Sequence, residues 1–201
     1  MRPSAAVTAP PTGTSARRPL RADAQRNYER LVSAARTVLS ERGSEASMEE
    51  IARRADVGVG TLYRHFPRRI DLVEAVYRDD VELLVTLAAT VAVDATPWDA
   101  LVEWLDGFVR YAQAKRVFLT ELHEAFEKNP ELAPHSREKI RVAAGVVLER
   151  AQQAGVARDD IDAADLMQLV GGMCMARDAS LERNERLLTL VLDGIRTTAR
   201  H

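Results

Sequence analysis

Residues 47–66 constrain the fold most, because their pattern describes two short helices joined by a tight turn. Ser47 and Glu50 have the spacing of a capping box, so a helix should begin at Ser47. Apolar residues then recur at i, i+3, i+4 and i+7, as Met48, Ile51, Ala52 and Ala55. This spacing predicts a helix with one buried face.

The second half of the segment predicts a turn and a helix with a polar outer side. Asp56 stands where the turn needs a residue that tolerates a positive φ, and Gly58 stands where the next helix needs a cap. Leu62 and Phe66 supply its buried side. The other side carries side chains with hydrogen-bond donors: Thr61, Tyr63, Arg64 and His65. That combination is typical of a recognition helix that lies against a phosphate backbone.

This pattern resembles the DNA-binding signature of the TetR family of transcriptional regulators. The matching positions are Ile51, Ala52, Ala55, Val57, Gly60, Thr61, Leu62, Tyr63, His65, Phe66 and Arg69. Two positions depart from the family pattern, since Asp56 replaces the usual glycine and Gly58 the usual serine. The resemblance covers about residues 25–72. Beyond them, only overall length and helical character are similar to the family.

Eight residues are expected to contact DNA. Phosphates or nearby sugars should be bound by Thr61, Tyr63 and His65, with Ser47 and Arg69 in support. The N-terminal half of a recognition helix enters the groove first. The residues best placed to approach base edges are therefore Val59, Gly60 and Arg64.

Composition favours an all-helical protein. The 201 residues are 46% hydrophobic but only 5% aromatic, and Ala, Leu, Arg and Glu abound. The net charge of −2 hides an asymmetry, because residues 1–70 are net basic and residues 71–201 net acidic. The basic end coincides with the two-helix motif, as expected if that end meets DNA.

Nothing in the composition indicates secretion or a membrane span. Cys174 is the only cysteine, which excludes an internal disulfide and fits a reducing cytoplasm. No apolar stretch approaches the roughly 20 residues that cross a bilayer, and the N-terminus lacks the apolar core of a signal peptide. We therefore expect a cytoplasmic protein with no membrane partner.

Three segments and nine helices are predicted. Residues 1–22 are rich in Pro, Ala, Ser, Thr and Arg and should form a disordered tail. In that tail Arg17, Arg18 and Arg21 could reach a minor groove or simply be solvated. Residues 23–70 should form a three-helix DNA-binding domain, and 71–201 a ligand-binding and dimerisation domain. A long helix over about 68–92 should link the two.

A homodimer is the expected working form, because one helix-turn-helix monomer reads only a few base pairs. The last two helices, 162–182 and 185–199, are the best candidates for the interface, the second with Asn184 as its cap. The interface residues would be Leu166, Leu169, Val170, Met173, Leu187, Leu188, Val191 and Ile195. The family resemblance implies the same four-helix bundle. The alternative is that these faces only close the core of the monomer.

The resemblance also implies a pocket for a small-molecule effector in the C-terminal domain. The candidate lining residues are Trp104, Phe108, Tyr111, Phe118, Leu122, His123, Phe126, Met167, Met173 and Arg177. His123 and Arg177 are polar residues in apolar company, and a buried Arg needs an anion. For each residue the alternative is a place in the core.

Catalysis is not indicated. The four histidines and one cysteine show no metal-ligand spacing, so no metal or cofactor is expected. The segment from Val57 to Gly60 lacks the ending of a phosphate-binding loop, and Cys174 has the setting of a small core residue. The sequence predicts a transcriptional regulator that acts as a repressor. A small molecule would release it from a palindromic operator. The alternative is an all-helical ligand-binding or scaffold protein with a vestigial DNA-binding module.

Overall fold

The computed structural model describes residues 17–197, of which 17–21 are described by their backbone alone. Over this range the fold is all-α, as predicted, with nine α-helices and two short 3-10 turns. The α-helices are α1 (Arg17–Arg42), α2 (Met48–Arg54), α3 (Val59–His65), α4 (Arg69–Asp94), α5 (Pro97–Lys115), α6 (Leu119–Lys128), α7 (Leu132–Gln153), α8 (Ala163–Met175) and α9 (Leu181–Ile195). The 3-10 turns are η1 (Gly43–Glu45) and η2 (Arg116–Phe118).

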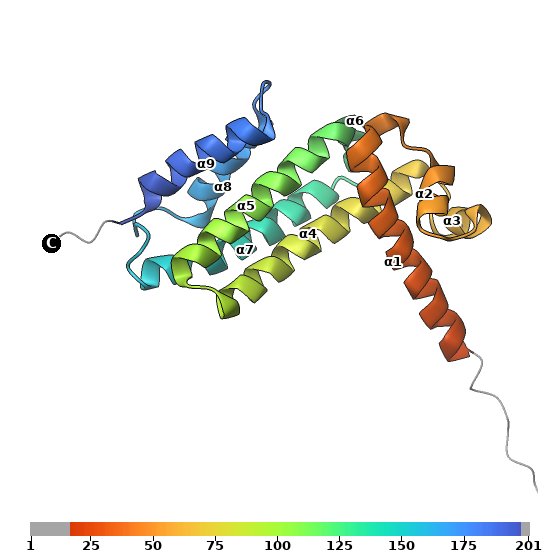
Figure 1. Ribbon diagram of the computed structural model, residues 1–201, viewed down its shortest axis with the longest axis horizontal. Coiled ribbons are helices and arrows are strands. Elements are labelled where there is room, and N and C mark those ends of the chain that lie inside the picture. Colours follow the sequence, from red (N-terminus) through yellow and green to blue (C-terminus); the bar gives the residue numbers. More distant parts are fainter. Residues whose placement is uncertain (1–16, 198–201) are drawn as a thin grey trace, which may run out of the picture.

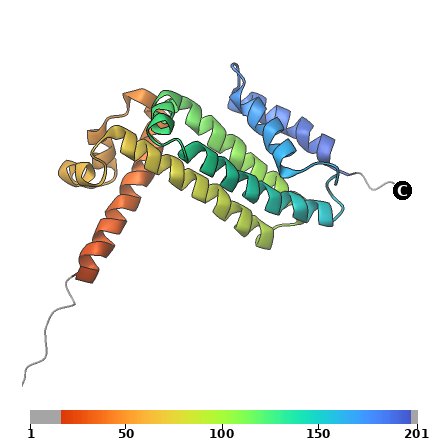
Figure 2. The ribbon, with the colours of Figure 1, turned by 180° about the vertical axis from the view of Figure 1, so that it is seen from behind.

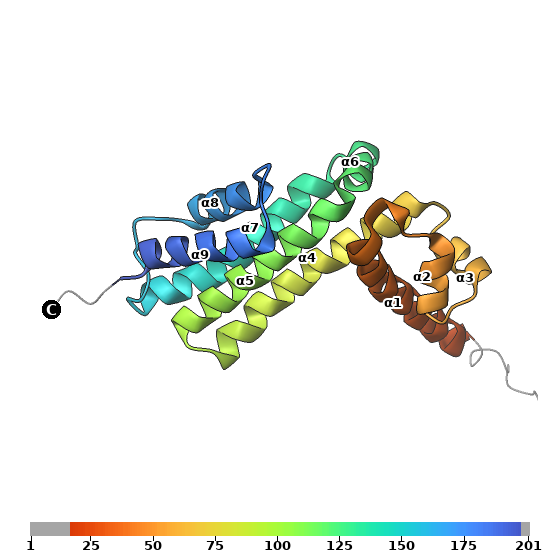
Figure 3. The same ribbon diagram turned by 45° about the horizontal axis from the view of Figure 1, so that its top comes forward.

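Helices α1–α3 form a head at one end of an elongated molecule, and the remaining helices form the body (Figure 1). Helix α4 starts beside the head and runs the length of the body next to α7 (Figure 2). Helices α8 and α9 lie over α5 and α7 at the end of the body away from the head (Figure 3). None of the described helices has the length and apolar character needed to cross a membrane.

Local sequence signals position the head. The Ser47 hydroxyl accepts a hydrogen bond of 3.1 Å from the Glu50 backbone N–H and caps α2. Asp56 has a φ of 52°, which is the left-handed turn conformation that its short polar side chain tolerates. Gly58 is the N-cap of α3. These three predictions of the turn are confirmed.

The head is built around buried apolar side chains that belong to the core of the molecule. Helix α1 buries one face, and the same core contains residues from α2, α3 and the chain that follows: Leu31, Val32, Ala35, Val38, Leu39, Ile51, Ala52, Leu62 and Phe66. Leu62 is fully buried in the middle of α3, so the opposite side of this short helix must face outward. The core therefore fixes which side of α3 is available to a partner.

The tail predicted for residues 1–22 is wrong over its last six positions, because α1 begins at Arg17. Residues 17–25 are mostly good helix formers, and Pro19 falls in the first turn, where its missing N–H removes no helical hydrogen bond. The arm considered for Arg17, Arg18 and Arg21 is thus helical backbone at these positions. Residues 1–16 lie outside the described part of the chain.

The ends of the last two helices also differ from expectation. Helix α8 stops at Met175 because the Arg116 guanidinium donates hydrogen bonds to the carbonyl groups of Cys174 (3.1 Å) and Ala176 (2.9 Å), which replaces helical partners. Helix α9 is capped by Ser180, four residues before the expected Asn184, so it starts one turn earlier than expected and ends at Ile195. Asn184 is fully buried inside the fold.

Candidate nucleic-acid interface and internal cavity

The outer side of α3 is open to solvent. Side chains at its start and middle are exposed, with Val59 at 40% and Tyr63 at 42% of their full accessible surface. A Cβ placed on Gly60 would meet nothing within 4 Å. A phosphate backbone that approaches α3 would therefore meet no side chain at Gly60, between the exposed Val59 and Tyr63.

Two polar side chains on this surface are held by weak internal contacts. The Tyr63 hydroxyl donates to the Glu49 carboxylate at 3.3 Å, and Arg64 Nε donates to the Gly60 carbonyl at 3.2 Å. Desolvation and the Glu49 charge raise the pKa of Tyr63, so its phenol stays a hydrogen-bond donor at neutral pH. Both contacts are exposed, and a phosphate oxygen can replace either one at little cost.

Thr61 and His65 are half-buried along the edge of the same surface. The His65 ring packs between aromatic neighbours, with its centroid 6.2 Å from that of Tyr28 and 6.1 Å from that of Phe66. Ser47 is exposed at the start of α2, and its hydroxyl proton remains available after it has accepted the cap hydrogen bond. Six of the eight expected residues thus belong to α3, around its buried Leu62, and Ser47 caps the neighbouring α2.

Arg69 is the exception, because its guanidinium is bound inside the protein; its expected contact with a phosphate stays a prediction. Its guanidinium donates to the carbonyl groups of Ala46 and Gly43 (3.0 Å for Gly43) and to the Glu121 carboxylate of α6 at 3.2 Å. These three acceptors occupy the planar fork. Arg69 therefore joins the loop before α2 to the body, a destination that sequence spacing alone does not reveal.

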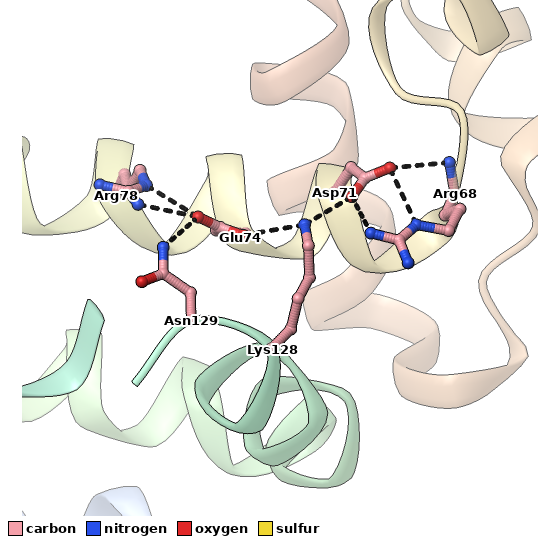
Figure 4. A network of polar contacts seen from close by, with 6 residues as sticks. All are labelled: Arg68, Asp71, Glu74, Arg78, Lys128 and Asn129. Atoms are coloured by element: carbon pink, nitrogen blue, oxygen red, sulfur yellow. Dashed lines mark hydrogen bonds and ion pairs between the residues drawn. The ribbon is translucent and has the colours of Figure 1, made fainter. Parts of the chain in front are cut away.

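A second set of ion pairs joins α6 to the start of α4 (Figure 4). Lys128 Nζ lies 2.7 Å from Asp71 and 3.3 Å from Glu74, and the Asn129 amide donates to Glu74 at 3.0 Å. Hydrogen bonds from Arg68 and Lys128 lower the pKa of Asp71 to about 2. The C-terminal end of α6 is therefore fixed to the first turns of α4, next to the head.

The body contains a cavity of about 560 Å³, which falls within the range of about 300–1,000 Å³ that is typical of small-ligand sites. Its wall draws on α4, α5, α6, α7 and α8. Five of the expected pocket residues line it: Phe108, Tyr111, Leu122, Phe126 and Met167. Helix α6 forms one wall through Leu119, Leu122 and Phe126, so the helix that is tied to α4 also borders the cavity.

Five other expected pocket residues lie elsewhere. Trp104 is fully buried in the core, where its Nε1 donates to the Leu84 carbonyl at 3.0 Å, and Phe118 is buried without lining the cavity. His123 is exposed on the outside of α6, 3.7 Å from Glu127, because α6 turns its apolar face inward at Leu122 and Phe126 instead. Met173 lies in a groove between α8 and α9. Arg177 lies in the exposed chain after α8.

Sequence reasoning missed the charged residues of the cavity. Three basic side chains line it, Lys115, Arg137 and Arg141, together with Tyr77, Gln168 and Cys174. One signal was available for Lys115, which follows Phe108 and Tyr111 at i+7 and i+4 on the apolar face of α5. Burial raises the pKa of the Cys174 thiol to about 11, in keeping with an unreactive core cysteine.

Lys115 is buried without a hydrogen-bond partner for its ammonium group. Its Nζ lies 3.5 Å from the ring centroid of Tyr111, 4.1 Å from that of Tyr77 and 3.9 Å from the Asp80 carboxylate. The other Asp80 oxygen accepts a hydrogen bond of 2.6 Å from Arg36 of α1. Burial lowers the pKa of Lys115 to about 7, although the Asp80 charge opposes this shift.

The outer face of α8 and α9 is apolar and exposed. Leu169 is 55% exposed and Leu190 is 67% exposed, and a groove of about 400 Å³ runs between the two helices. Of the expected interface residues, the groove is lined by Leu166, Leu169, Met173, Leu187, Val191 and Ile195. Val170 and Leu188 are instead buried in the core of the monomer and do not line the groove. Leu190 was not predicted.

The described residues contain no cluster of three or more His, Cys, Asp or Glu side chains that could hold a metal ion. The head, its exposed second motif helix and the cavity-bearing helical body define a helix-turn-helix DNA-binding regulator. Comparisons with known proteins extend this assignment to both parts of the chain.

Family models match both the head and the body. The model described as bacterial regulatory proteins, tetR family, matches residues 31–76, and the model described as transcriptional regulator SbtR-like, C-terminal domain, matches residues 96–197. The HTH-type transcriptional regulator UidR of Escherichia coli is 27% identical over 195 residues, which cover 90% of this chain and 98% of UidR.

Two solved structures are similar over most of the chain. A TetR transcriptional regulator from Streptomyces coelicolor is 37% identical with a TM-score of 0.77, and the match covers 86% of this chain and 99% of that one. A TetR transcription regulatory protein from Mycobacterium vanbaalenii is 34% identical with a TM-score of 0.69, covering 89% and 100%. The chain belongs to the TetR family of DNA-binding transcriptional regulators.

Proposed function

We propose that the protein is a homodimeric repressor that occupies a palindromic operator and leaves it when a small molecule fills the cavity of the body. One observation carries this proposal: helix α6 both borders the cavity and binds the start of α4, next to the head. Leu122 and Phe126 border the cavity, whereas Glu121 and Lys128 of the same helix bind Arg69 and Asp71 at the start of α4. A ligand that moves α6 therefore acts directly on the helix that carries the head.

A second connection supports the same route. Lys115 in the cavity faces Asp80 of α4, and Asp80 binds Arg36 of α1 inside the head. Arg36 also pairs with Asp79, so two carboxylates of α4 hold this one guanidinium. An effector shifts the equilibrium between two head orientations only by its different affinity for them, and both connections give it a means to do so.

DNA is proposed to meet the outer side of α3. Tyr63, Thr61 and His65 would bind the backbone. Val59 and Gly60 in the first turn of α3 would approach base edges, together with Arg64, which lies in the last turn of this short helix. The support is their exposure around the buried Leu62 and the weakness of their internal contacts. Such a regulator acts where the chromosome is, which is the reason to place it in the cytoplasm.

The dimer is proposed to form through the apolar face of α8 and α9. Leu169 and Leu190 are large apolar side chains that a monomer would leave in water. A Cβ added at Gly172 or Gly194 would meet nothing within 4 Å, so a second pair of helices can approach closely at these positions. A two-fold axis there would place the two heads on the same side of the assembly for two half-sites.

A selection of random duplexes, followed by sequencing, tests the proposal. It should return an inverted repeat with half-sites one helical turn or a multiple apart. Tyr63→Phe removes one hydroxyl and should weaken binding to the selected duplex and to variants of it alike, by about 1 kcal/mol. Thr90→Val also removes one exposed hydroxyl, on α4 away from the head, and is the control that should bind like the wild type.

Arg64→Ala separates the two kinds of DNA contact. If Arg64 reads a base, the variant should tolerate changes at one position of each half-site; if it binds phosphate only, the salt slope should fall by about 1 with no change in preference. Failure to enrich any duplex at moderate salt would favour the second candidate, a helical ligand-binding or scaffold protein. The cavity is the observation that favours it.

A further inference from the structure

The cavity that borders α6 has a one-sided charge. Its lining includes three basic side chains, Lys115, Arg137 and Arg141, and not one Asp or Glu. The rest of the lining is mainly aromatic and aliphatic. A neutral ligand would leave this positive field without a partner, and a cation would be repelled. The charge distribution alone favours an occupant with a negative group.

The three basic side chains differ in exposure and in whether their hydrogen-bond donors already have partners. Arg137 and Arg141 are exposed at the rim, and Arg141 binds Glu138 at 2.6 Å. Lys115 lies deep in the wall, only 6% exposed, with no hydrogen bond to its Nζ. Its nearest carboxylate, Asp80, is 3.9 Å away, which is too long for a hydrogen bond.

Asp80 is also a poor partner for a second reason, since its other oxygen already binds Arg36. The faces of Tyr77 and Tyr111 stabilise the ammonium through cation–π contacts but accept no conventional hydrogen bond. A buried ammonium with unused donors, beside a cavity that holds no acidic side chain, is a site for an anion.

We infer that the cavity binds an amphipathic organic anion, with its acid group on Lys115 and its apolar body against the aromatic and aliphatic wall. This inference rests on the proposed function, because it takes the cavity to be the effector site. The acid group would be a carboxylate or another oxyanion, reaching Lys115 past the rim formed by Arg137 and Arg141. Phe108, together with other apolar residues of the wall, would contact the body of the ligand.

The inference also specifies what binding changes. An acid group on Lys115 neutralises the ammonium that Asp80 now faces, and leaves Asp80 with Arg36 as its main partner. Since Arg36 belongs to α1 of the head, the ligand would alter the pairing between body and head without touching DNA. Occupation of the cavity also presses on α6 through Leu122.

Matched acid and amide pairs test the inference on the full-length protein without DNA. Calorimetric titration with benzoate, 2-naphthoate and decanoate, each against its primary amide, compares ligands that differ only in charge. We expect the wild type to bind at least one acid at least roughly tenfold more tightly than its amide. Lys115→Met should bring the affinity for that acid down to that for the amide.

A proton balance supplies a readout that a purely structural lysine would not give. Titrations at pH 8 in buffers of different ionisation enthalpy should show uptake of most of one proton per acid bound to the wild type, because the Lys115 pKa of about 7 leaves its amine largely neutral there. The groups that face Lys115 are Asp80, Arg36, Tyr77 and Tyr111. Lys115→Met should abolish the uptake.

Lys139→Met is the matched control, since Lys139 is an exposed lysine of α7 that binds Glu82 outside this cavity. It should keep both the acid preference and the proton uptake. The inference is overturned if no acid is preferred over its amide in any of the three pairs, or if Lys115→Met keeps the preference. Because these measurements contain no DNA, they stand apart from the duplex selection, whose failure would refute the regulator and not the anion site.

Discussion

Lys115→Met should stabilise the folded protein, and the gain should shrink as pH rises. A buried ammonium without a hydrogen bond costs free energy, and methionine offers an unbranched apolar side chain for the same space. Replacement of a buried charge by an apolar residue of similar volume is often neutral or stabilising. The neighbouring Tyr77 and Tyr111 rings suit a thioether as well as an ammonium.

The pKa of Lys115 sets the size of the effect. It is lowered from 10.5 to about 7, first by burial and against the attraction of Asp80. Between these values the unfolded chain binds a proton that the folded chain has released, so the wild type gains stability as pH rises, by about 1.4 kcal/mol per pH unit. The cost of Lys115 to the fold is thus about 4 kcal/mol at pH 7 and about 2 kcal/mol at pH 9.

Urea unfolding of both proteins at pH 7, 8 and 9, followed by circular dichroism, measures the difference directly. All other ionisable groups are common to the two proteins and cancel in that difference. The advantage of Lys115→Met should fall by about 2 kcal/mol from pH 7 to pH 9. A difference that stays constant over this range would show that Lys115 keeps an ordinary pKa in the fold, and the account of its burial would be refuted.

Three further substitutions test other parts of the structure. Gly43→Ala should destabilise the fold by about 2–4 kcal/mol in urea unfolding, because φ is +55° and the new Cβ would lie 2.8 Å from the Val117 carbonyl oxygen. The control Gly145→Ala, where the new Cβ makes only ordinary contacts in α7, should be neutral or slightly stabilising. An equal loss of stability in both variants would contradict the reasoning. Arg69→Met should cost about 2 kcal/mol of stability yet leave the salt slope of DNA binding unchanged, whereas a slope lower by about 1 would identify Arg69 as a phosphate ligand after all. Leu190→Glu should change monomer stability by less than about 0.5 kcal/mol but weaken dimerisation at least roughly tenfold in analytical ultracentrifugation, and an unchanged dimer would remove the α8–α9 face from the interface.

The parts of the fold that could be predicted are those that neighbouring residues determine. The Ser47 cap, the left-handed Asp56 and the Gly58 N-cap depend on atoms a few residues apart, so the sequence pattern contains them. The apolar stripes of α1, α5 and α7 follow from helical periodicity in the same way. Both ends of the two-helix motif could therefore be predicted from the sequence.

The residues that were misplaced depend on partners far along the chain. Arg69 binds Glu121 across 52 positions, and Arg116 ends α8 by binding carbonyl groups nearly 60 positions later. No local sequence pattern predicts such long-range pairs. Arg177 was expected on the helical stripe of Met173, but α8 ends before Arg177, and Met173 itself lines the outer groove and not the cavity.

Helix rotation explains the remaining errors. An apolar stripe tells which residues avoid water, but α8 and α9 each have two apolar sides, one for the core and one exposed. Val170 and Leu188 belong to the first side, and Leu169 and Leu190 to the second. Only packing against the other helices of the body decides between them.

The Arg69 contacts set a condition for building chimeric regulators from this chain. A foreign head grafted before α4 would have to present two backbone carbonyl groups to Arg69 where Gly43 and Ala46 now stand, or the guanidinium that also binds Glu121 would lose most of its acceptors. A junction before Gly43 would preserve every one of these contacts, but it would also leave α2 and α3 with the recipient body and so transfer no new recognition helix. A junction after Arg69, near residue 70, would keep the arginine with the turn that it holds but would require the donor head to supply the partner of Glu121.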